Sequence, residues 1–385
     1  MRIDNIYKVP TPCYVVEEKK LKHNLEILKY VADESGAKVL LAQKAFSMFR
    51  VYPLISKYLS GTTASGIYEA RLGFEEMKGG EVHVFCPAYK EKDMDELVKI
   101  CDHIIFNSVN QWNKFKNTIF ANKVSAGIRV NPEYSEVETD LYDPCGEYSR
   151  LGIKEGEFFA ALENGELEGI DGIHFHTMCE QGADTLERTL VAVEKRFGRF
   201  LKSNQCKWVN FGGGHHITRE CYDLDLLISE IKRIRDKYSV EVYIEPGEAI
   251  ALNAGVLITE VMDIRKDGNI FISILDTSAA CHMPDVLEMP YRPYITGSYV
   301  AFKKKYTYRF GGPTCLAGDV IGEYSFDEEL KIGDRLEFHD MAIYSMVKNN
   351  TFNGMPLPAI LLEKSDGEIE LVREFSYEDF KQRLS

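Results

Sequence analysis

Short apolar runs alternate with longer amphipathic stretches from about residue 38 to residue 244 of this 385-residue chain. Eight runs have the length and composition of buried strands, at 38–42, 61–64, 81–85, 103–106, 124–130, 170–176, 208–211 and 241–244. Between them, apolar residues recur at three- and four-residue spacing, which predicts helices in segments such as 66–78, 94–100, 155–164, 185–201 and 223–237. This alternation predicts a parallel (β/α)₈ TIM-type barrel. A doubly wound open sheet is the competing arrangement, but eight units in about 210 residues suit closure better.

The chain beyond the eighth run has a different pattern. Strand-like runs at 256–262, 270–275, 305–310 and 335–338 are separated by turn sequences and little helix. We expect a mostly β C-terminal domain, built as a barrel or sandwich, and the strand-like segment 12–16 is expected to join it. The predicted boundaries are 36–254 for the (β/α)₈ barrel, and 1–35 with 255–385 for the β domain.

Composition excludes several classes of protein. The net charge of −14 argues against nucleic-acid binding; it is compatible with a cationic ligand, although acidity can also serve solubility alone. Long apolar runs are absent from the sequence, so no membrane span is predicted, and the first residues lack a signal-peptide pattern. The nine cysteines form no CxxC pair, so we expect no metal site, no disulfide framework and a cytoplasmic location.

Chemically useful residues follow five of the predicted strands. Lys44 comes after the first, Arg129 lies near the end of the fifth, and His176 ends the sixth. The glycines 212–214 follow the seventh strand and Glu245 follows the eighth. Functional groups of such barrels lie at the C-terminal ends of the strands, so we expect these residues on one rim. Taken singly, each has a simpler explanation: a surface lysine, a core histidine, a flexible turn or a turn cap.

Together these residues suit one cofactor. A lysine amine can form a Schiff base with an aldehyde. Three glycines leave backbone N–H groups free to approach a phosphate. A carboxylate can keep a pyridine nitrogen protonated, which makes the ring an electron sink. The set predicts pyridoxal 5′-phosphate.

The chain resembles the pyridoxal-phosphate decarboxylases with an alanine-racemase-like barrel, a family that includes ornithine and diaminopimelate decarboxylases. The resemblance covers nearly the whole length, and its motifs are Thr11-Pro-Cys-Tyr-Val-Val, Ala42-Gln-Lys44-Ala, Ser149-Arg-Leu-Gly-Ile, Phe175-His176, Gly212-Gly-Gly214, Glu245-Pro-Gly247, Gly312-Pro-Thr-Cys315 with Asp319, Asp340-Met-Ala-Ile-Tyr344 and Thr351-Phe-Asn-Gly354. Many motifs in one order make this a specific signal.

The resemblance implies a role for each site residue. Lys44 would bind the cofactor covalently and release product, His176 would stack on its ring, and Glu245 would pair with its pyridine nitrogen. Backbone contacts to the phosphate would come from Gly213, Gly214 and Gly247. The partner subunit's Tyr344 would reach the phosphate and the partner subunit's Cys315 would protonate the intermediate, which implies a homodimer with shared active sites.

The residue opposite the pyridine nitrogen separates two reaction types. Racemases of this barrel family place an arginine there, which limits electron withdrawal by the ring. This chain has Glu245, and a carboxylate favours the stronger electron sink that loss of CO₂ requires. The resemblance therefore implies an amino acid decarboxylase, a carboxy-lyase.

Three positions depart from the better-known relatives. Leu316 replaces a glutamate of the diaminopimelate enzymes, Cys179 replaces a serine, and Glu248 stands where ornithine-type enzymes have an arginine. Segments 138–145, 178–180 and 245–248 look most like the carboxynorspermidine and carboxyspermidine decarboxylases, enzymes of polyamine (spermidine) biosynthesis. Their substrate is a cationic triamine with one α-amino acid end, and its product is norspermidine or spermidine.

Carboxylates near the site would pair with the distal amines, which are cationic at neutral pH. The candidates are Glu248 and Asp285, with Glu180 behind them; each is also explained as a solvated surface carboxylate. Two alternatives stay open. One is a decarboxylase of diaminopimelate or another basic amino acid. The other is a catalytically inactive regulatory homologue, disfavoured because the lysine, histidine, glutamate and cysteine of the motifs are all present.

Overall fold

The computed structural model describes residues 6–139 and 142–385. They form two compact units: His23–Ile250, here called the barrel unit, and the N-terminal 22 residues with Ala251–Ser385, here called the sheet unit. Residues 1–5, to which the signal-peptide expectation applied, and residues 140–141 of segment 138–145 lie outside the described residues. The domain boundaries at 36 and 254 stay a prediction.

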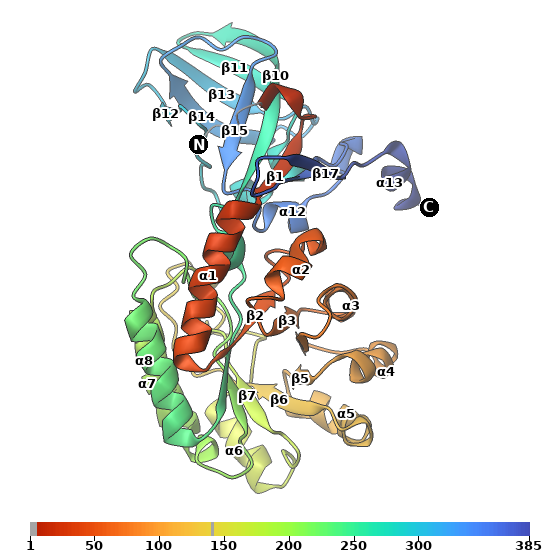
Figure 1. Cartoon of the computed structure of the whole chain (residues 1–385), viewed down its shortest axis with the longest axis vertical. Coiled ribbons are helices and arrows are strands. Elements are labelled where there is room, and N and C mark those ends of the chain that lie inside the picture. The colour runs from red at the N-terminus through yellow and green to blue at the C-terminus, as the bar shows by residue number, and fades with distance from the viewer. Residues whose placement is uncertain (1–5, 140–141) are drawn as a thin grey trace. The chain divides into compact units, whose positions relative to one another are not determined.

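Within the described residues of the barrel unit, eight parallel strands close into a barrel in chain order, β2 to β9 (Figure 1). Pairing of Lys38 with Tyr243 joins the first strand to the last. The strands are β2 (Lys38–Ala42), β3 (Gly61–Ala64), β4 (Glu81–Phe85), β5 (His103–Phe106), β6 (Ser125–Arg129), β7 (Gly172–His174), β8 (Trp208–Asn210) and β9 (Glu241–Ile244). The predicted fold class is confirmed. The sixth predicted strand ends earlier than expected, so His176 lies in the loop after β7.

Helices follow the strands and lie outside the barrel (Figure 1). They are α1 (Glu18–Ser35), η2 (Phe49–Val51), α2 (Tyr52–Ile55), α3 (Ile67–Glu76), α4 (Glu91–Ile100), α5 (Val109–Asn122), α6 (Glu155–Glu163), α7 (Ala183–Leu201), α8 (Leu224–Tyr238) and α9 (Glu248–Ala251). Side-chain caps fix two of the starts: Ser108 accepts the Gln111 N–H at α5, and Asp223 accepts the Leu226 N–H at α8.

Trp208 determines how the barrel interior is packed. Its indole lies inside the barrel and donates from Nε1 to the Ser125 hydroxyl at 3.0 Å. A Cβ on Gly127 or Gly172 would lie only 2.1 or 2.2 Å from the indole. Glycine at these two positions therefore makes room for the largest side chain in the strands.

The sheet unit is built around one sheet with strand order β12-β14-β13-β11-β10-β1-β16-β17, and β15 pairs with β10. Its strands are β1 (Cys13–Glu17), β10 (Gly255–Asp267), β11 (Ile270–Leu275), β12 (Tyr299–Val300), β13 (Tyr306–Gly311), β14 (Val320–Phe326), β15 (Arg335–His339), β16 (Ala359–Glu363) and β17 (Ile369–Arg373). Short helices complete it: η1 (Ile6–Lys8), α10 (Ala279–His282), α11 (Asp285–Glu288), α12 (Ser345–Lys348), η4 (Phe352–Gly354) and α13 (Tyr377–Gln382). The N-terminal strand β1 lies between β10 and β16.

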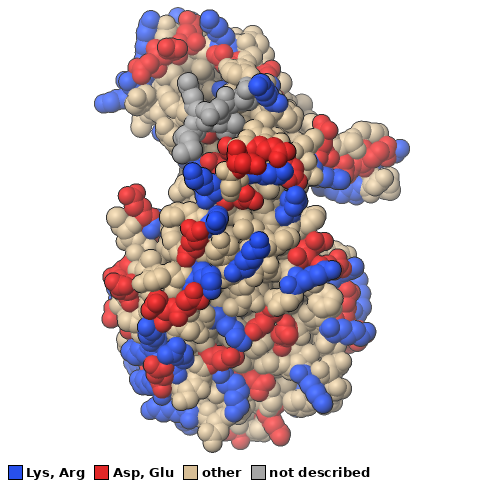
Figure 2. Space-filling view, in the orientation of Figure 1, with Lys and Arg blue, Asp and Glu red and all other residues tan. Residues whose placement is uncertain are grey.

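Charged side chains of both signs intermix on the face of the barrel unit drawn in Figure 2. The net charge of −14 is therefore not gathered into one acidic patch on that face. Among the described residues, no helix is both long and apolar enough to cross a membrane.

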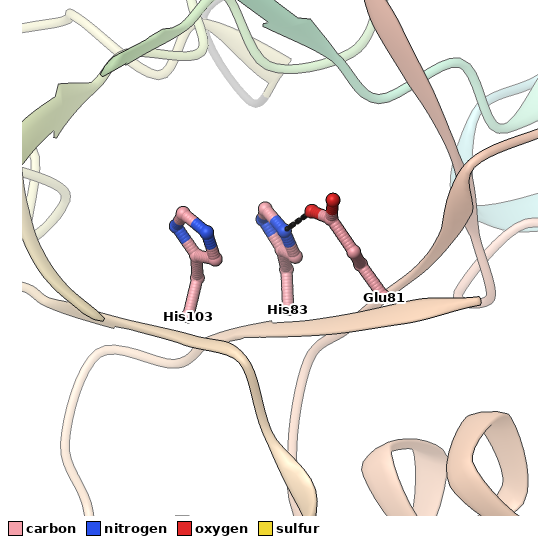
Figure 3. Close-up of side chains that lie close together, drawn as sticks. All are labelled: Glu81, His83 and His103. Atoms are coloured by element: carbon pink, nitrogen blue, oxygen red, sulfur yellow. Dashed lines mark hydrogen bonds and ion pairs between the residues drawn. The ribbon is translucent and has the colours of Figure 1, made fainter. Parts of the chain in front are cut away.

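Glu81 and His83 of β4 lie close to His103 of β5 (Figure 3). His83 Nε2 lies 3.0 Å from Glu81 Oε2, and the two imidazole rings stack at 4.1 Å. Two histidines and a carboxylate are a ligand set that zinc accepts. Here Lys38 Nζ binds the other oxygen, Glu81 Oε1, at 2.6 Å, so both carboxylate oxygens have partners and a cation is already present. We interpret the cluster as a polar part of the barrel core.

This cluster predicts acid sensitivity. Burial, with His83 nearby, lowers the pKa of His103 to about 2. The unfolded chain, with a histidine pKa near 6.5, binds this proton and the folded chain does not, so stability falls as pH drops below about 6.5. The contribution is up to about 1.4 kcal/mol per pH unit. His103→Phe, which keeps an aromatic ring, should flatten the fall in unfolding free energy between pH 6.5 and 5, measured by urea unfolding. Parallel pH curves for the two proteins would contradict this assignment.

Candidate active site

Four of the predicted site elements lie at the C-terminal ends of barrel strands. Lys44 follows β2, His176 follows β7, the loop 212–214 follows β8, and Glu245 directly follows β9. Because the strands are parallel and closed, these loops share one rim. The last residue of β2 is also joined to the loop after β9, by a hydrogen bond from the Ala42 N–H to the Pro246 carbonyl at 3.1 Å.

The Lys44 amine has a lowered pKa. Its side chain reaches solvent, but surrounding protein atoms remove much of its hydration, and the positive charge of Arg129 adds to this effect. Glu245 and Cys179 act in the opposite direction and do not reverse it. A larger neutral fraction makes the amine a better nucleophile toward a carbonyl carbon.

Glu245 is a buried carboxylate that stays ionised. It is 7% exposed, and burial alone would raise its pKa. His174 and Asn210 outweigh that effect and lower the pKa to about 2. The contacts are His174 Nε2 to Oε2 at 3.2 Å and Asn210 Nδ2 to Oε1 at 2.8 Å. At neutral pH the rim therefore presents a fixed negative charge, which is what a protonated ring nitrogen needs as a partner.

Asn210 and His174 were missed by the sequence analysis. Asn210 is fully buried, and its amide oxygen accepts the Gly212 N–H at 2.8 Å while its NH₂ group binds Glu245. One side chain thus ties the glycine loop to the carboxylate. The available signal was a polar residue in a buried strand directly before three glycines. His174 was visible in the His-Phe-His motif, but only the second histidine was given a role.

His176 is held by the glycine loop. Its Nδ1 accepts the Gly213 N–H at 3.0 Å, and its carbonyl accepts from Arg129 Nη2 at 3.2 Å. Burial lowers the pKa of His176 well below its usual range, and the cations Lys44 and Arg129 lower it further. The ring is therefore neutral with a fixed orientation, as a stacking surface should be. The Gly213 N–H, expected at a phosphate, is donated to this ring in the structure.

The glycine positions leave no space for side chains. A Cβ would lie 2.5 Å from the Glu245 carbonyl oxygen if placed on Gly213, and 2.0 Å from the Met178 carbonyl oxygen if placed on Gly214. On Gly247 it would lie 2.8 Å from the Ala45 Cβ. Glycine therefore lets these loops pack directly against one another. A glycine-rich loop without side chains, an ionised buried carboxylate and an amine of lowered pKa fit pyridoxal phosphate.

Two of the three predicted substrate carboxylates lie near Cys179 on the rim. Burial raises the pKa of the Cys179 thiol to about 11, and the negative charges of Glu180 and Glu248 contribute, while Lys44 opposes them. Both carboxylates therefore act on the same region as the lysine. Glu248 is the first residue of α9, three positions after Glu245.

The remaining predicted residues belong to the sheet unit. Cys315 is exposed in the loop between β13 and β14, and Tyr344 directly precedes α12. Asp285 begins α11 and forms an ion pair with Lys348, which also contacts Glu288. Part of the Asp285 charge is thus already neutralised within its own unit. Participation of these three residues in the barrel site stays a prediction.

Comparison with known proteins identifies relatives over almost the full chain. The family model described as "Pyridoxal-dependent decarboxylase, C-terminal sheet domain" matches residues 13–342. The carboxynorspermidine/carboxyspermidine decarboxylase of Campylobacter jejuni is 44% identical over 98% of this chain and 99% of its own length. The carboxyaminopropylagmatine decarboxylase of Synechocystis is 43% identical, with 98% and 96% covered.

A solved structure is equally similar. The crystal structure of carboxynorspermidine decarboxylase from Campylobacter jejuni, complexed with norspermidine, has a TM-score of 0.90. It is 43% identical in sequence and covers 97% of this chain and 100% of its own.

Asn210→Leu tests the link between the glycine loop and Glu245. The substitution removes a hydrogen bond to a buried charge, which is worth about 1.5–3 kcal/mol, so affinity for pyridoxal phosphate should fall about tenfold to a hundredfold. Fluorescence titration of the apoprotein measures this affinity. Gln205→Leu is the matched control, because its amide binds the Leu167 and Ile170 carbonyls instead. Equal affinity in wild type and Asn210→Leu would show that the link is dispensable.

Proposed function

The chain belongs to the pyridoxal-dependent decarboxylase family, and we propose that within it the protein decarboxylates carboxynorspermidine, carboxyspermidine or both. The proposed substrate rests on one observation. Over nearly its full length, the chain is 44% identical to a relative named carboxynorspermidine/carboxyspermidine decarboxylase. The rim geometry supports it, because Glu180 and Glu248 add negative charge beside the proposed cofactor site.

Membership in the family confirms the class of enzyme expected from the sequence, a decarboxylase. This enzyme class also agrees with the identity of Glu245, the residue that would lie opposite the ring nitrogen in the proposed site. Glu245 is a buried, ionised carboxylate. It can hold a proton on a pyridine nitrogen and so favour withdrawal of electrons from the substrate.

Pyridoxal phosphate, when bound, supplies an electron sink for the pair left behind when CO₂ departs from the substrate Cα. Lys44 Nζ would be the nucleophile that holds the cofactor between turnovers, and it would give way to the substrate α-amine. His176 would hold the cofactor ring in place by stacking on it. Its fixed, neutral imidazole is suited to this because the Gly213 N–H already occupies Nδ1.

Cys315 is the proposed proton donor to the substrate Cα after CO₂ is lost. We propose that it reaches the site from a second copy of the chain, together with Tyr344 at the phosphate. The protein would then be a homodimer with two shared sites. The exposure of Cys315 is consistent with contact to a partner.

The substrate is held at its far end by carboxylates. A triamine carries two further cationic amines, and desolvating these without partners would be costly. Glu248 and Glu180 are the proposed partners, and both lie near Cys179 on the rim. Asp285 is a weaker candidate because Lys348 already pairs with it.

A second substrate is favoured by one observation, the 43% identity to a carboxyaminopropylagmatine decarboxylase. That compound also joins an α-amino acid end to a distal cation. The two proposals share the same chemistry at Lys44 and Glu245. They are separated by kcat/KM on the two compounds, measured in parallel with diaminopimelate.

Lys44→Ala should remove the covalent bond to the cofactor. Borohydride reduction of the wild-type holoenzyme should leave a pyridoxyl group on the peptide containing Lys44, seen by mass spectrometry. The variant should show no such mass and turnover reduced by several orders of magnitude. A pyridoxyl mass on another lysine of the wild type would overturn the assignment.

Glu248→Gln should weaken binding of the distal amines. We expect KM for carboxynorspermidine to rise about tenfold with kcat within about twofold, because the lost contact is the same in ground and transition states. Glu187→Gln, on the exposed surface of α7, is the matched control. Loss of kcat at unchanged KM would instead assign Glu248 to the chemical step.

A further inference from the structure

Asp319 is a buried carboxylate that the proposed function does not use. It is 4% exposed and stands at the end of the loop 312–319, which joins β13 to β14 and carries Cys315. The base of the loop is closed by the Gly312 N–H, which donates to the Asp319 carbonyl at 3.0 Å. The Asp319 N–H in turn donates to the Leu316 carbonyl at 3.0 Å, which folds the loop back past the cysteine.

Three donors satisfy the Asp319 side chain. The Ser278 hydroxyl lies 2.9 and 3.0 Å from its two oxygens, and the Ala280 N–H donates to Oδ1 at 3.2 Å. The Thr314 hydroxyl donates to Oδ2 at 2.7 Å. The first two donors belong to the start of α10, and the third belongs to the residue immediately before Cys315.

The approach of these segments is tight. A Cβ on Gly312 would lie 2.2 Å from Asp319 Oδ2 and 2.8 Å from the Ser278 Cα, so only glycine fits there. Ser278 itself is fixed, because its hydroxyl oxygen also accepts the Cys281 N–H at 3.1 Å. The carboxylate thus fastens one side of an exposed loop to a rigid helix start.

Burying a carboxylate is costly, and hydrogen bonds from Ser278, Ala280 and Thr314 offset that cost here. Among the described residues, no lysine, arginine or histidine forms an ion pair with Asp319. Ordinary hairpin loops close through backbone bonds without such a charge. The cost of burying Asp319 is explained if this carboxylate is needed to fix the orientation of Thr314. Fixing Thr314 also fixes the position of the adjacent Cys315.

We propose that Asp319 is a positioning residue that aims the Cys315 thiol at the substrate Cα. This inference rests on the proposed role of Cys315 as proton donor. Bound pyridoxal phosphate would supply the electron sink for the pair left at the substrate Cα when CO₂ leaves. The thiol proton forms a C–H bond at Cα, the amine product is released, and the thiolate regains a proton from water.

A displaced thiol changes where the proton arrives. A proton delivered to the cofactor instead of the substrate Cα would, after addition of water, give pyridoxamine phosphate and an aldehyde in place of the amine. The ratio of pyridoxamine phosphate to amine therefore reports whether the Cys315 thiol is placed to protonate the substrate Cα. A general loss of stability lowers the amount of active enzyme and leaves this ratio unchanged.

The test compares Asp319→Asn with Cys315→Ala in the full-length holoenzyme. Carboxynorspermidine is the substrate, and chromatography quantifies pyridoxamine phosphate and amine. We expect the ratio to rise about tenfold in Asp319→Asn, with KM within about twofold, and further in Cys315→Ala. Hydrogen exchange of the apoprotein should be faster in peptides covering 312–319 of Asp319→Asn, and this measurement does not depend on activity.

Two further variants keep the test decisive. Thr314→Val removes only the bond nearest the cysteine, so it should raise the ratio even if Asp319→Asn does not fold. Asp276→Asn is the matched control, because this carboxylate also accepts a threonine hydroxyl and a backbone N–H in the sheet unit but lies outside the loop. It should leave the ratio at the wild-type value.

The outcomes separate the two proposals. An unchanged ratio in Cys315→Ala overturns the proposed role of the cysteine. A raised ratio in Cys315→Ala with wild-type ratios in Asp319→Asn and Thr314→Val overturns positioning by Asp319. Size-exclusion chromatography shows whether each variant keeps the oligomeric state of the wild type. If a variant changes the ratio of pyridoxamine phosphate to amine only because it has dissociated into monomers, positioning of Cys315 by Asp319 is contradicted as well.

Discussion

The candidate site depends on keeping one buried carboxylate charged. Glu245 is almost fully enclosed, and an isolated charge in such a place would normally take up a proton. Hydrogen bonds from Asn210 and His174 prevent this. The Asn210 amide also binds the Gly212 N–H, so the charge and the bare backbone loop are fixed by the same side chain. The carboxylate and the glycine loop are therefore linked through one buried amide.

The same physical solution occurs in the sheet unit. Asp319 is as buried as Glu245, and it too is stabilised by hydrogen bonds to neutral groups. In both places the carboxylate lies beside a loop that carries candidate site residues. Hydrogen bonds to a charged acceptor are stronger and more directional than those between neutral groups. They therefore restrain loops that packing alone would leave loosely defined.

Local pattern predicted the barrel because each strand is a short run of three to five mostly buried residues. The bounds of β2, β3, β4, β5 and β9 agree with the apolar runs read from the sequence. The runs at 124–130, 170–176 and 208–211 gave strands shorter than predicted. Val130, Phe175 and Phe211 are buried in rim loops instead, and burial alone does not distinguish a strand from a buried loop. Helix α1 was not anticipated; its many charged residues conceal the apolar stripe.

The sequence by itself determined the fold class and the motifs of the family, because both are written in residues close together along the chain. Tertiary structure alone decided the charge state of the site. Asn210 and Glu245 are 35 positions apart, and His174 and Glu245 are 71 positions apart. The lowered pKa of Lys44 and the fixed ring of His176 depend on such distant neighbours too. Electrostatic interactions act through space, so their partners became identifiable only once the barrel had closed.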